Sequence, residues 1–299
     1  MNSLLSPSEV KRLQSWGAAS SRMPAAVVLG MPHLCMLGLS ETWLLKECGH
    51  RHWYLLAEAA GLATPDFRDP DGEPIYAAFL GVSIRDAAFE TVREHDELVF
   101  RSRLTRISRT RFMSVHQLAV AGRLVGEIAM TSAFVRRAQK GNNHTIARVE
   151  VPALRGVELD PQSVACAAET AALRSGRWHA HLGFERRKAA VLDRFIVDPC
   201  PGQDFNGADF LYFASFQAFV DRAEWAFFRT QAPRPTTRRR DIIYRRNIDP
   251  GERVAVSLLQ FRRDAQCLDH WYHLQREPDG LTIAEIFTAR ALATSMSGP

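Results

Sequence analysis

The chain has 299 residues, a length of about two domains, with 46% hydrophobic and 24% charged residues. This composition excludes a fibrous or largely disordered protein, and no run of about 18 apolar residues occurs that would span a membrane. The first residues contain no apolar signal-peptide core, so we expect a cytoplasmic protein with no membrane partner. The net charge is only +5 and no nucleic-acid-binding motif is present, so we expect no nucleic-acid partner.

The spacing of cysteine and histidine indicates neither a disulfide framework nor a metal centre. The five cysteines are scattered and form no CxxC pair. His50 and His52 are two positions apart, so they lie on different faces of a predicted helix. We therefore expect no bound metal and interpret the thiols as small buried side chains.

The first half of the sequence predicts one long helix followed by strands. The helix starts at Ser40, a good N-cap residue, and ends near Gly61, a good C′ residue. Inside it, Gly49 costs about 1 kcal/mol relative to alanine, which indicates that another element packs close to it. Two strands joined by a basic turn follow from His95, and a third begins near Ala121.

The second half repeats this pattern. A helix is predicted within residues 207–229, apolar almost all round in its first half, and two strands follow from Pro250. The segment that begins at Ala121 recurs from Asp279 in a single frame. The matched pairs are Gly122 with Gly280, Val125 with Ile283, Glu127 with Glu285, Ile128 with Ile286, and Ala133 with Ala291. A repeat of this size, present twice, predicts duplication of a whole domain rather than a solenoid.

These elements predict an α+β protein with a tandem, or double, hot-dog fold. In that arrangement each unit is an antiparallel sheet wrapped around one long central helix. We expect an N-terminal extension at 1–26, a first unit at 27–137, a linker at 138–185 and a second unit at 186–299. The linker is richer in polar and small residues and contains one helical run around 163–174.

The segment that enters the second helix carries the sharper candidate site. Free N–H groups at a helix N-terminus stabilise the oxygen of a thioester as negative charge develops on it. Gly207 would let the thioester approach the backbone, Asp204 would act as a base or orient a water, and Asn206 would bind the acyl group. The alternative is that Asp204 or Asn206 only caps the helix. Asp204, Gly207 and Tyr212 together resemble the signature of hot-dog acyl-CoA thioesterases, which implies an Asp on the entering loop and a Gly that opens the helix.

A second candidate lies at the start of the first helix. His33, Gly38, Ser40 and Glu41 fall on the loop and the first turn of that helix, so they are expected near a second set of free N–H groups. The alternatives are a purely structural loop role for His33 and a purely capping role for Ser40.

Three stretches resemble the LnmK-like double hot-dog bifunctional acyltransferase/decarboxylases of polyketide pathways. They are LLKECGHRHW on the first helix, PIYAAFLGVSI on the following strand, and DFNGADFLYFASF on the second helix. The resemblance implies decarboxylation of a malonyl- or methylmalonyl-type acyl-CoA and transfer of the acyl group to an acyl carrier protein. It implies no cofactor apart from the coenzyme A or phosphopantetheine of the substrate. The expected partners are therefore an acyl-CoA substrate and an acyl carrier protein, and a homodimer is a further possibility.

This sequence departs from that family on the strand after the first helix. The family has tyrosines after the position of Phe79, where this chain has Leu80, Gly81 and Val82. Tyr76 lies earlier on the strand and is not equivalent. We expect no acyl-tyrosine intermediate, and we expect Gly81 to leave space for a larger acyl group or for a carrier thiol.

A basic segment later in the chain is the candidate for binding phosphate. Arg238, Arg239 and Arg240 are expected to grip coenzyme A or an acidic carrier protein by charge-assisted hydrogen bonds, the alternative being a solvated basic strand. The sequence thus predicts an acyl-thioester enzyme of the decarboxylating, acyl-transferring type. A thioesterase in which Asp204 activates water and a catalytically silent thioester-binding protein are the alternatives.

Overall fold

The computed structural model describes residues 23–229, 234–277 and 279–292. Most of the predicted extension, 1–22, and the end of the second unit therefore lie outside the described residues. No helix in the described ranges is long and apolar enough to cross a membrane.

The strands fall into two sets, one from each half of the chain. Those of the first half are β1 (Ala26–Val28), β4 (Tyr76–Arg85), β5 (Glu97–Ser108), β6 (Arg111–Val120), β7 (Arg123–Arg137) and β8 (Ile146–Arg148). Those of the second half are β11 (Asp193–Val197), β12 (Pro235–Tyr244), β13 (Val254–Arg263), β14 (Leu268–Arg276) and β15 (Thr282–Leu292). Two small ladders join β2 (Leu34–Cys35) to β3 (Gly38–Leu39) and β9 (Ala180–His181) to β10 (Phe184–Glu185).

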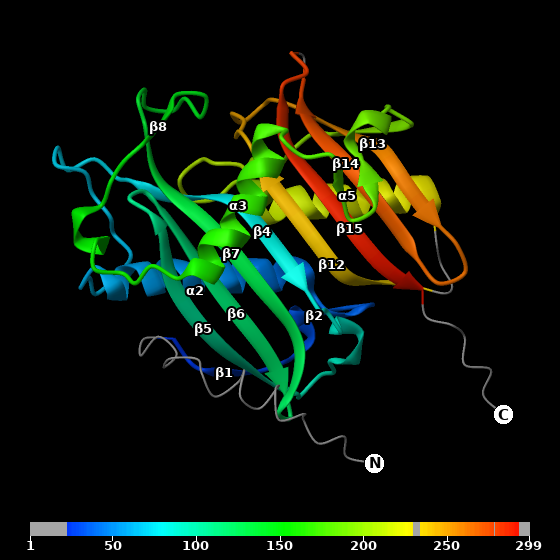
Figure 1. The fold of residues 1–299 in the computed structure, drawn as a ribbon, viewed down its shortest axis with the longest axis horizontal. Coiled ribbons are helices and arrows are strands. Elements are labelled where there is room, and N and C mark those ends of the chain that lie inside the picture. The colour runs from blue at the N-terminus through cyan, green and yellow to red at the C-terminus, as the bar shows by residue number, and fades with distance from the viewer. Residues whose placement is uncertain (1–22, 230–233, 278, 293–299) are drawn as a thin grey trace.

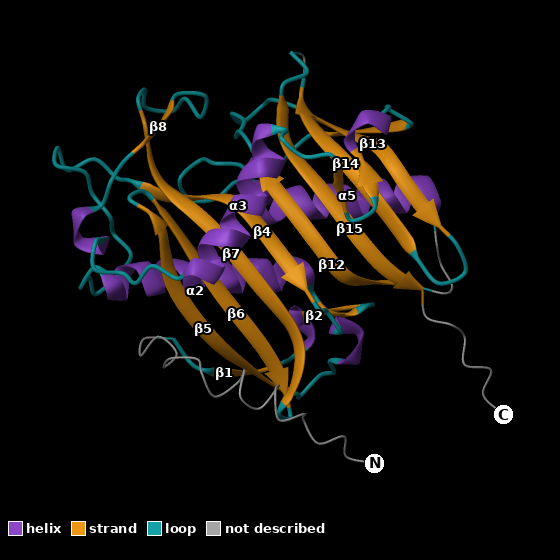
Figure 2. Cartoon of the chain, viewed as in Figure 1, coloured by secondary structure: helices purple, strands orange, loops and turns teal. Residues whose placement is uncertain are grey.

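The two sets form a single antiparallel sheet of eleven strands in the described residues. Its order is β1-β5-β6-β7-β4-β12-β15-β14-β13-β11, with β8 beside β7 (Figure 2). The halves meet where β4 pairs with β12, with Ser83 opposite Asp241. Within each half the repeat takes the same place: Ile128 of β7 lies opposite Ile84, and Ile286 of β15 lies opposite Ile242. The prediction of a duplicated hot-dog unit is confirmed, and the two units share one continuous sheet.

Each half wraps one buried helix, as predicted. The helices are α2 (Glu41–Ala59) and α5 (Phe213–Phe228), and both lie on the same face of the sheet (Figure 1). Ser40 caps α2 by accepting a hydrogen bond from the amide of Trp43. One hydrophobic core joins both helices to both halves of the sheet, so the near-continuous apolar surface of α5 is explained by its burial.

The prediction that Gly207 opens the second helix is wrong. A short helix, α4 (Pro201–Asp204), is followed by a loop, and α5 begins only at Phe213. The Oδ1 atom of Asn206 accepts hydrogen bonds from the amides of Ala208 and Phe210, which folds the chain back on itself. Asp209 then takes a φ of 59°, a left-handed conformation that a helix cannot continue through.

The expected helical run in the linker is α3 (Pro161–Ser175), which lies across the sheet face opposite to α2 and α5 (Figure 1). This position corrects the expectation that Gly81 leaves space for substrate. A Cβ atom on Gly81 would lie 2.5 Å from Cγ2 of Thr170 on α3. Gly81 therefore lets α3 pack closely on the sheet, and the methyl group of Thr170 fills the space.

Candidate functional site

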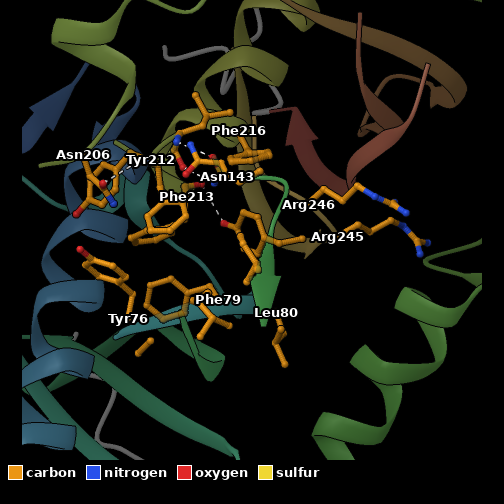
Figure 3. A pocket seen from close by; sticks show the side chains of 18 of the residues that line it. Tyr76, Phe79, Leu80, Asn143, Asn206, Tyr212, Phe213, Phe216, Arg245 and Arg246 are labelled. Carbon is orange, nitrogen blue, oxygen red and sulfur yellow. Dashed lines mark hydrogen bonds between the residues drawn. The ribbon is translucent and has the colours of Figure 1, made fainter. Parts of the chain in front are cut away.

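A cavity of about 640 Å³ opens between the N-terminus of α5, the middle of α2 and the adjoining ends of β4 and β12. Aromatic side chains form much of its wall (Figure 3). These are Trp53, Tyr76, Phe79, Phe210, Tyr212, Phe213, Phe216 and Tyr244. Gly49 of α2 makes room for one of them, because a Cβ atom there would lie 2.7 Å from the ring of Phe213. The close packing predicted at Gly49 is confirmed.

The N-terminus of α5 opens on this cavity without a side-chain cap. Tyr212 takes the N-cap position, and its own amide donates to the carbonyl oxygen of Asp204 at 2.7 Å. The hydroxyl of Ser215 donates to the same oxygen, and the hydroxyl of Tyr244 donates to the carbonyl of Phe213. The first amides of a helix have no acceptor within it, so this end offers N–H groups and a positive dipole to a ligand.

Asn206 and Tyr212 are the two predicted site residues that line the large cavity. Oδ1 of Asn206 accepts hydrogen bonds from two loop amides, so the side chain holds the loop that forms this part of the cavity wall. Burial raises the pKa of Tyr212 above its ordinary value, which keeps the phenol protonated.

Asp204 lies beside the cavity rather than in its wall. The side chain is buried, and its Oδ2 accepts a hydrogen bond from the amide of Cys200 at 2.9 Å. Together with its carbonyl, which holds Tyr212 and Ser215, this fixes the loop that presents the start of α5. The arrangement gives Asp204 a positioning role.

The charged groups that line the large cavity are all basic among the described residues. Five arginines and two histidines contribute: Arg148, Arg174, Arg245, Arg246, Arg276, His50 and His144. Burial and, to a smaller extent, the charges of nearby Arg148 and Arg245 lower the pKa of Arg174 to about 10. Arg245 is balanced by Glu285 at 3.0 Å, and Arg276 pairs with Asp279.

A second, smaller cavity of about 140 Å³ lies at the N-terminus of α2. Ser40 and Glu41 from the predicted first site line it, together with Gln217 and Asp221 of α5 and Arg290 of β15. Here the charges are paired across short distances. Asp221 Oδ1 lies 2.7 Å from Arg290 and 2.8 Å from Arg240, and Arg240 also reaches Glu41 at 2.9 Å.

The other predicted residues lie outside the two cavities. Nδ1 of His33 accepts a hydrogen bond from the amide of Gly30, and the ring packs edge-on against Trp43. Gly38, at φ 94°, passes so close to the backbone of Phe89 that no side chain would fit.

The three predicted phosphate-binding arginines are held in ion pairs. Arg238 pairs with Glu90 and Arg239 with Asp241, and Arg240 is completely buried. The alternative of a solvated basic strand is therefore wrong for Arg240.

One group of potential metal ligands occurs in the described residues. Ligand atoms of His144, Asp249 and Glu252 lie within 4.8 Å of one another at the rim of the large cavity. A guanidinium nitrogen of Arg276 lies 2.9 Å from Nε2 of the same histidine. This positive charge takes the place that a cation would need.

No protein-family model matches the sequence, and no curated protein is similar to it. Solved structures are similar in fold. The fold is a double hot-dog. A 12:0-ACP thioesterase from Umbellularia californica superposes with a TM-score of 0.63 at 10% identity, covering 89% of this chain and 92% of that one. An acyl-ACP thioesterase from Bacteroides thetaiotaomicron gives 0.59 at 8%, covering 89% and 96%.

A protein from Lactobacillus plantarum described as an oleoyl thioesterase gives a TM-score of 0.64 at 12% identity, covering 93% of this chain and all of that one (100%). The likeness extends over both halves in each case. At these identities it shows the double hot-dog fold and leaves the chemistry to be argued from the site.

The basic end of the large cavity was not predicted from the sequence. Arg174 lies on the linker helix α3, and Arg148 lies on β8. Arg245 and Arg246 follow closely after Arg238 to Arg240, the three arginines predicted to bind phosphate. The only signal in the sequence was the number of arginines, which does not say which of them meet.

Proposed function

We propose that this protein hydrolyses acyl thioesters, with the acyl group in the large cavity and the thioester carbonyl at the N-terminus of α5. The observation that carries the proposal is an uncapped helix N-terminus that opens on an aromatic-walled cavity of about 640 Å³. The occurrence of the same fold in acyl-ACP thioesterases supports it.

The chemistry follows from the groups at this end of the cavity. The thioester oxygen accepts hydrogen bonds from first-turn amides of α5, such as those of Phe213 and Ala214, where charge develops on it. Water adds to the carbonyl carbon, the carbon–sulfur bond breaks, and the thiolate takes up a proton, so an acid and a thiol leave.

We assign the role of general base to His50. It lies next to Gly49 on α2, lines the cavity and is exposed to solvent, so it can take the proton from the attacking water. His144, the other histidine in the wall, is held by Arg276. Asp204 keeps the positioning role that its hydrogen bonds give it.

Decarboxylation with acyl transfer to a carrier protein is the second candidate. The basic cavity favours it, because an arginine can bind the free carboxylate of a malonyl-type group, and the resulting enolate oxygen needs the same helix amides. Leu80 and Gly81 supply no phenol, so transfer would go directly from the donor thioester to the carrier thiol. Incubation with malonyl- and methylmalonyl-CoA, with and without carrier protein, followed by mass spectrometry, separates this reaction from hydrolysis.

The proposed function is tested by a matched pair of substitutions at the first residue of α5. Phe213→Pro and Phe213→Ala both remove the ring, but only proline removes the amide hydrogen, and proline is well tolerated at the first position of a helix. With a series of acyl-CoA substrates, we expect kcat of the proline variant to be lower than that of the alanine variant by about 10²- to 10³-fold. Equal kcat values, or no thiol release by the wild type, would contradict the proposal.

A further inference from the structure

Three arginines from three separate elements line one end of the large cavity without an acidic partner. They are Arg148 at the end of β8, Arg174 on α3, and Arg246 just after β12. No carboxylate within the described ranges forms an ion pair with any of them. Arg174 donates through Nε to the carbonyl of Tyr244 at 2.6 Å, and Arg246 donates to the carbonyl of Thr282 at 3.3 Å. These bonds orient the two side chains but leave their charge unbalanced.

The local positive charge favours the binding of an anion. Burial is the main reason that the pKa of Arg174 falls to about 10, and Arg148, Arg245 and Arg246 contribute through repulsion. By contrast, Arg245 has Glu285 beside it, Arg290 of the smaller cavity pairs with Asp221, and the neighbouring Arg240 pairs with Glu41. A partly buried group of like charges is stabilised by a bound anion, and guanidinium groups suit phosphate oxygens best.

The basic end and the aromatic end lie on different sides of the same cavity. In Figure 3, Arg245 and Arg246 extend away from Tyr76, Phe79 and Phe213 and toward α3. A ligand that spans the cavity therefore has an anionic group at one end and an apolar acyl group at the other. The pantetheine arm of coenzyme A or of a carrier protein has this form, with a phosphate at one end and a thioester at the other.

We propose that Arg148, Arg174 and Arg246 bind the phosphate of a phosphopantetheine arm and so hold the thioester at the start of α5. This inference rests on the proposed function for the reaction, but the binding it describes needs no turnover. The phosphate belongs either to coenzyme A or to the prosthetic group of a carrier protein, and both present the same chemistry to the arginines.

The experiment measures binding of four small molecules by calorimetry, with no thioester present. The probes are coenzyme A, dephospho-coenzyme A, 4′-phosphopantetheine and pantetheine. We expect each phosphate-bearing probe to bind at least about 10-fold more tightly than pantetheine, and binding to weaken as salt is added. If coenzyme A binds no more tightly than 4′-phosphopantetheine, the nucleotide adds nothing and a carrier-protein source is supported. If coenzyme A binds more tightly than 4′-phosphopantetheine, the free coenzyme is supported. Equal binding of pantetheine and its phosphorylated forms would overturn the inference.

Substitutions locate the phosphate. Arg148→Leu and Arg246→Leu change exposed side chains, so both variants are expected to fold, whereas Arg174→Gln tests the half-buried member. Each should weaken 4′-phosphopantetheine binding by about 10-fold. Arg194→Leu is the control, because Arg194 is exposed on β11, far along the sheet order from the cavity. The inference fails if the cavity variants bind as the wild type does, or if the control loses as much affinity.

Kinetics separates failure of this inference from failure of the proposed function. Against acyl-CoA, Arg246→Leu should raise KM by about 10-fold with kcat little changed. Against the matching acyl-N-acetylcysteamine, which has no phosphate, the same variant should behave as the wild type. An equal loss with both substrates would assign Arg246 to the structure of the cavity and overturn the inference. If the wild type hydrolyses neither, the proposed function is wrong, and the calorimetry still decides the phosphate site.

Discussion

The N-termini of the two central helices occupy equivalent places in a duplicated fold, yet they have different surroundings. The helices run antiparallel, so each N-terminus faces the middle of the other helix. Phe213, the first residue of α5, packs against Gly49 of α2. Glu41, the first residue of α2, is linked to Asp221 of α5 by Arg240, which pairs with both carboxylates. Gly49 and Asp221 each lie eight residues beyond the start of their helix. The cavity beside Gly49 has a volume of about 640 Å³, whereas the cavity beside Asp221 has a volume of about 140 Å³.

The smaller cavity is surrounded by ion pairs that connect the two halves of the protein. Arg240 of β12 joins Glu41 of the first half to Asp221 of the second, and Arg290 joins Asp221 to Glu224. Paired buried charges contribute little net stability, but removal of one partner costs several kcal/mol. In the large cavity Arg148, Arg174 and Arg246 have no acidic partner within the described ranges, whereas at the small cavity Arg240 and Arg290 are paired and link the two halves.

The largest effect is expected when Gly49 beside the large cavity is replaced by aspartate, the residue at the equivalent position, 221, beside the small cavity. Gly49→Asp places a Cβ atom within 2.7 Å of the ring of Phe213, which must then move into the cavity. Because displacement of a reacting group by about 1 Å can cost 10²-fold, we expect thioester hydrolysis to fall by about 10²-fold or more. Gly156→Asp is the control, since no atom lies within 4 Å of a Cβ there. Full activity of the Gly49→Asp variant would show that this contact does not shape the site.

The halves should also differ in their response to acid. His52 is fully buried between the hydroxyls of Ser114 and Ser132, and burial lowers its pKa from 6.5 to about 3. The unfolded chain then binds the proton first, so stability is present above about pH 6.5 and falls as the pH drops toward 3. The loss is on the order of 4 kcal/mol across that range.

Glu224, one of several buried acids of the second half, titrates at lower pH. Burial raises the pKa of Glu224, but Arg290 and His270 outweigh it and lower the pKa from 4.5 to about 2. The contribution of Glu224 to the free energy of unfolding is therefore present above about pH 4.5 and is lost only below that value. Urea unfolding at a series of pH values should show that His52→Gln reduces the slope of unfolding free energy against pH between about pH 6.5 and 4.5. Glu224→Gln should not reduce that slope, because it removes a carboxylate that raises the pKa of buried His270. The same slope in all three proteins would contradict this assignment.

A smaller effect is expected at Asp204, which distinguishes a positioning residue from a general base. Asn can still accept the hydrogen bond from the amide of Cys200, and the backbone contacts to Tyr212 and Ser215 remain. Asp204→Asn should therefore lower kcat by less than about 10-fold, and stability by about 1 kcal/mol or less. A fall of about 10²-fold with unchanged stability would make Asp204 the base that its sequence context suggests.

The smallest effect is expected at the capped helix. Ser40→Ala removes the hydrogen bond to the amide of Trp43 and should reduce the free energy of unfolding by about 1 kcal/mol. Activity per folded molecule should not change, because the reaction is proposed at the other helix. A clear loss of kcat in this variant would move the active site to the small cavity.

Much of the fold could be predicted from the sequence because its signals are local. The repeated glycine, glutamate and isoleucine positions near 121 and 279 indicate a duplicated unit, and long apolar helices need a sheet around them. The start of α5 was placed too early, because the hydrogen bonds of Asn206 and the left-handed turn at Asp209 leave no mark in hydrophobic periodicity.

By itself the sequence determined the two units, their central helices and the segments near which a site would form, since these depend on residue spacing along one stretch of chain. Only the tertiary structure decided which helix end is open, because that depends on Gly49 meeting Phe213 and Asp221 meeting Arg290. It also brought Arg148, Arg174 and Arg246 together from three elements. Contacts between residues so far apart in the chain follow from the packing of whole elements, and composition and spacing do not encode them.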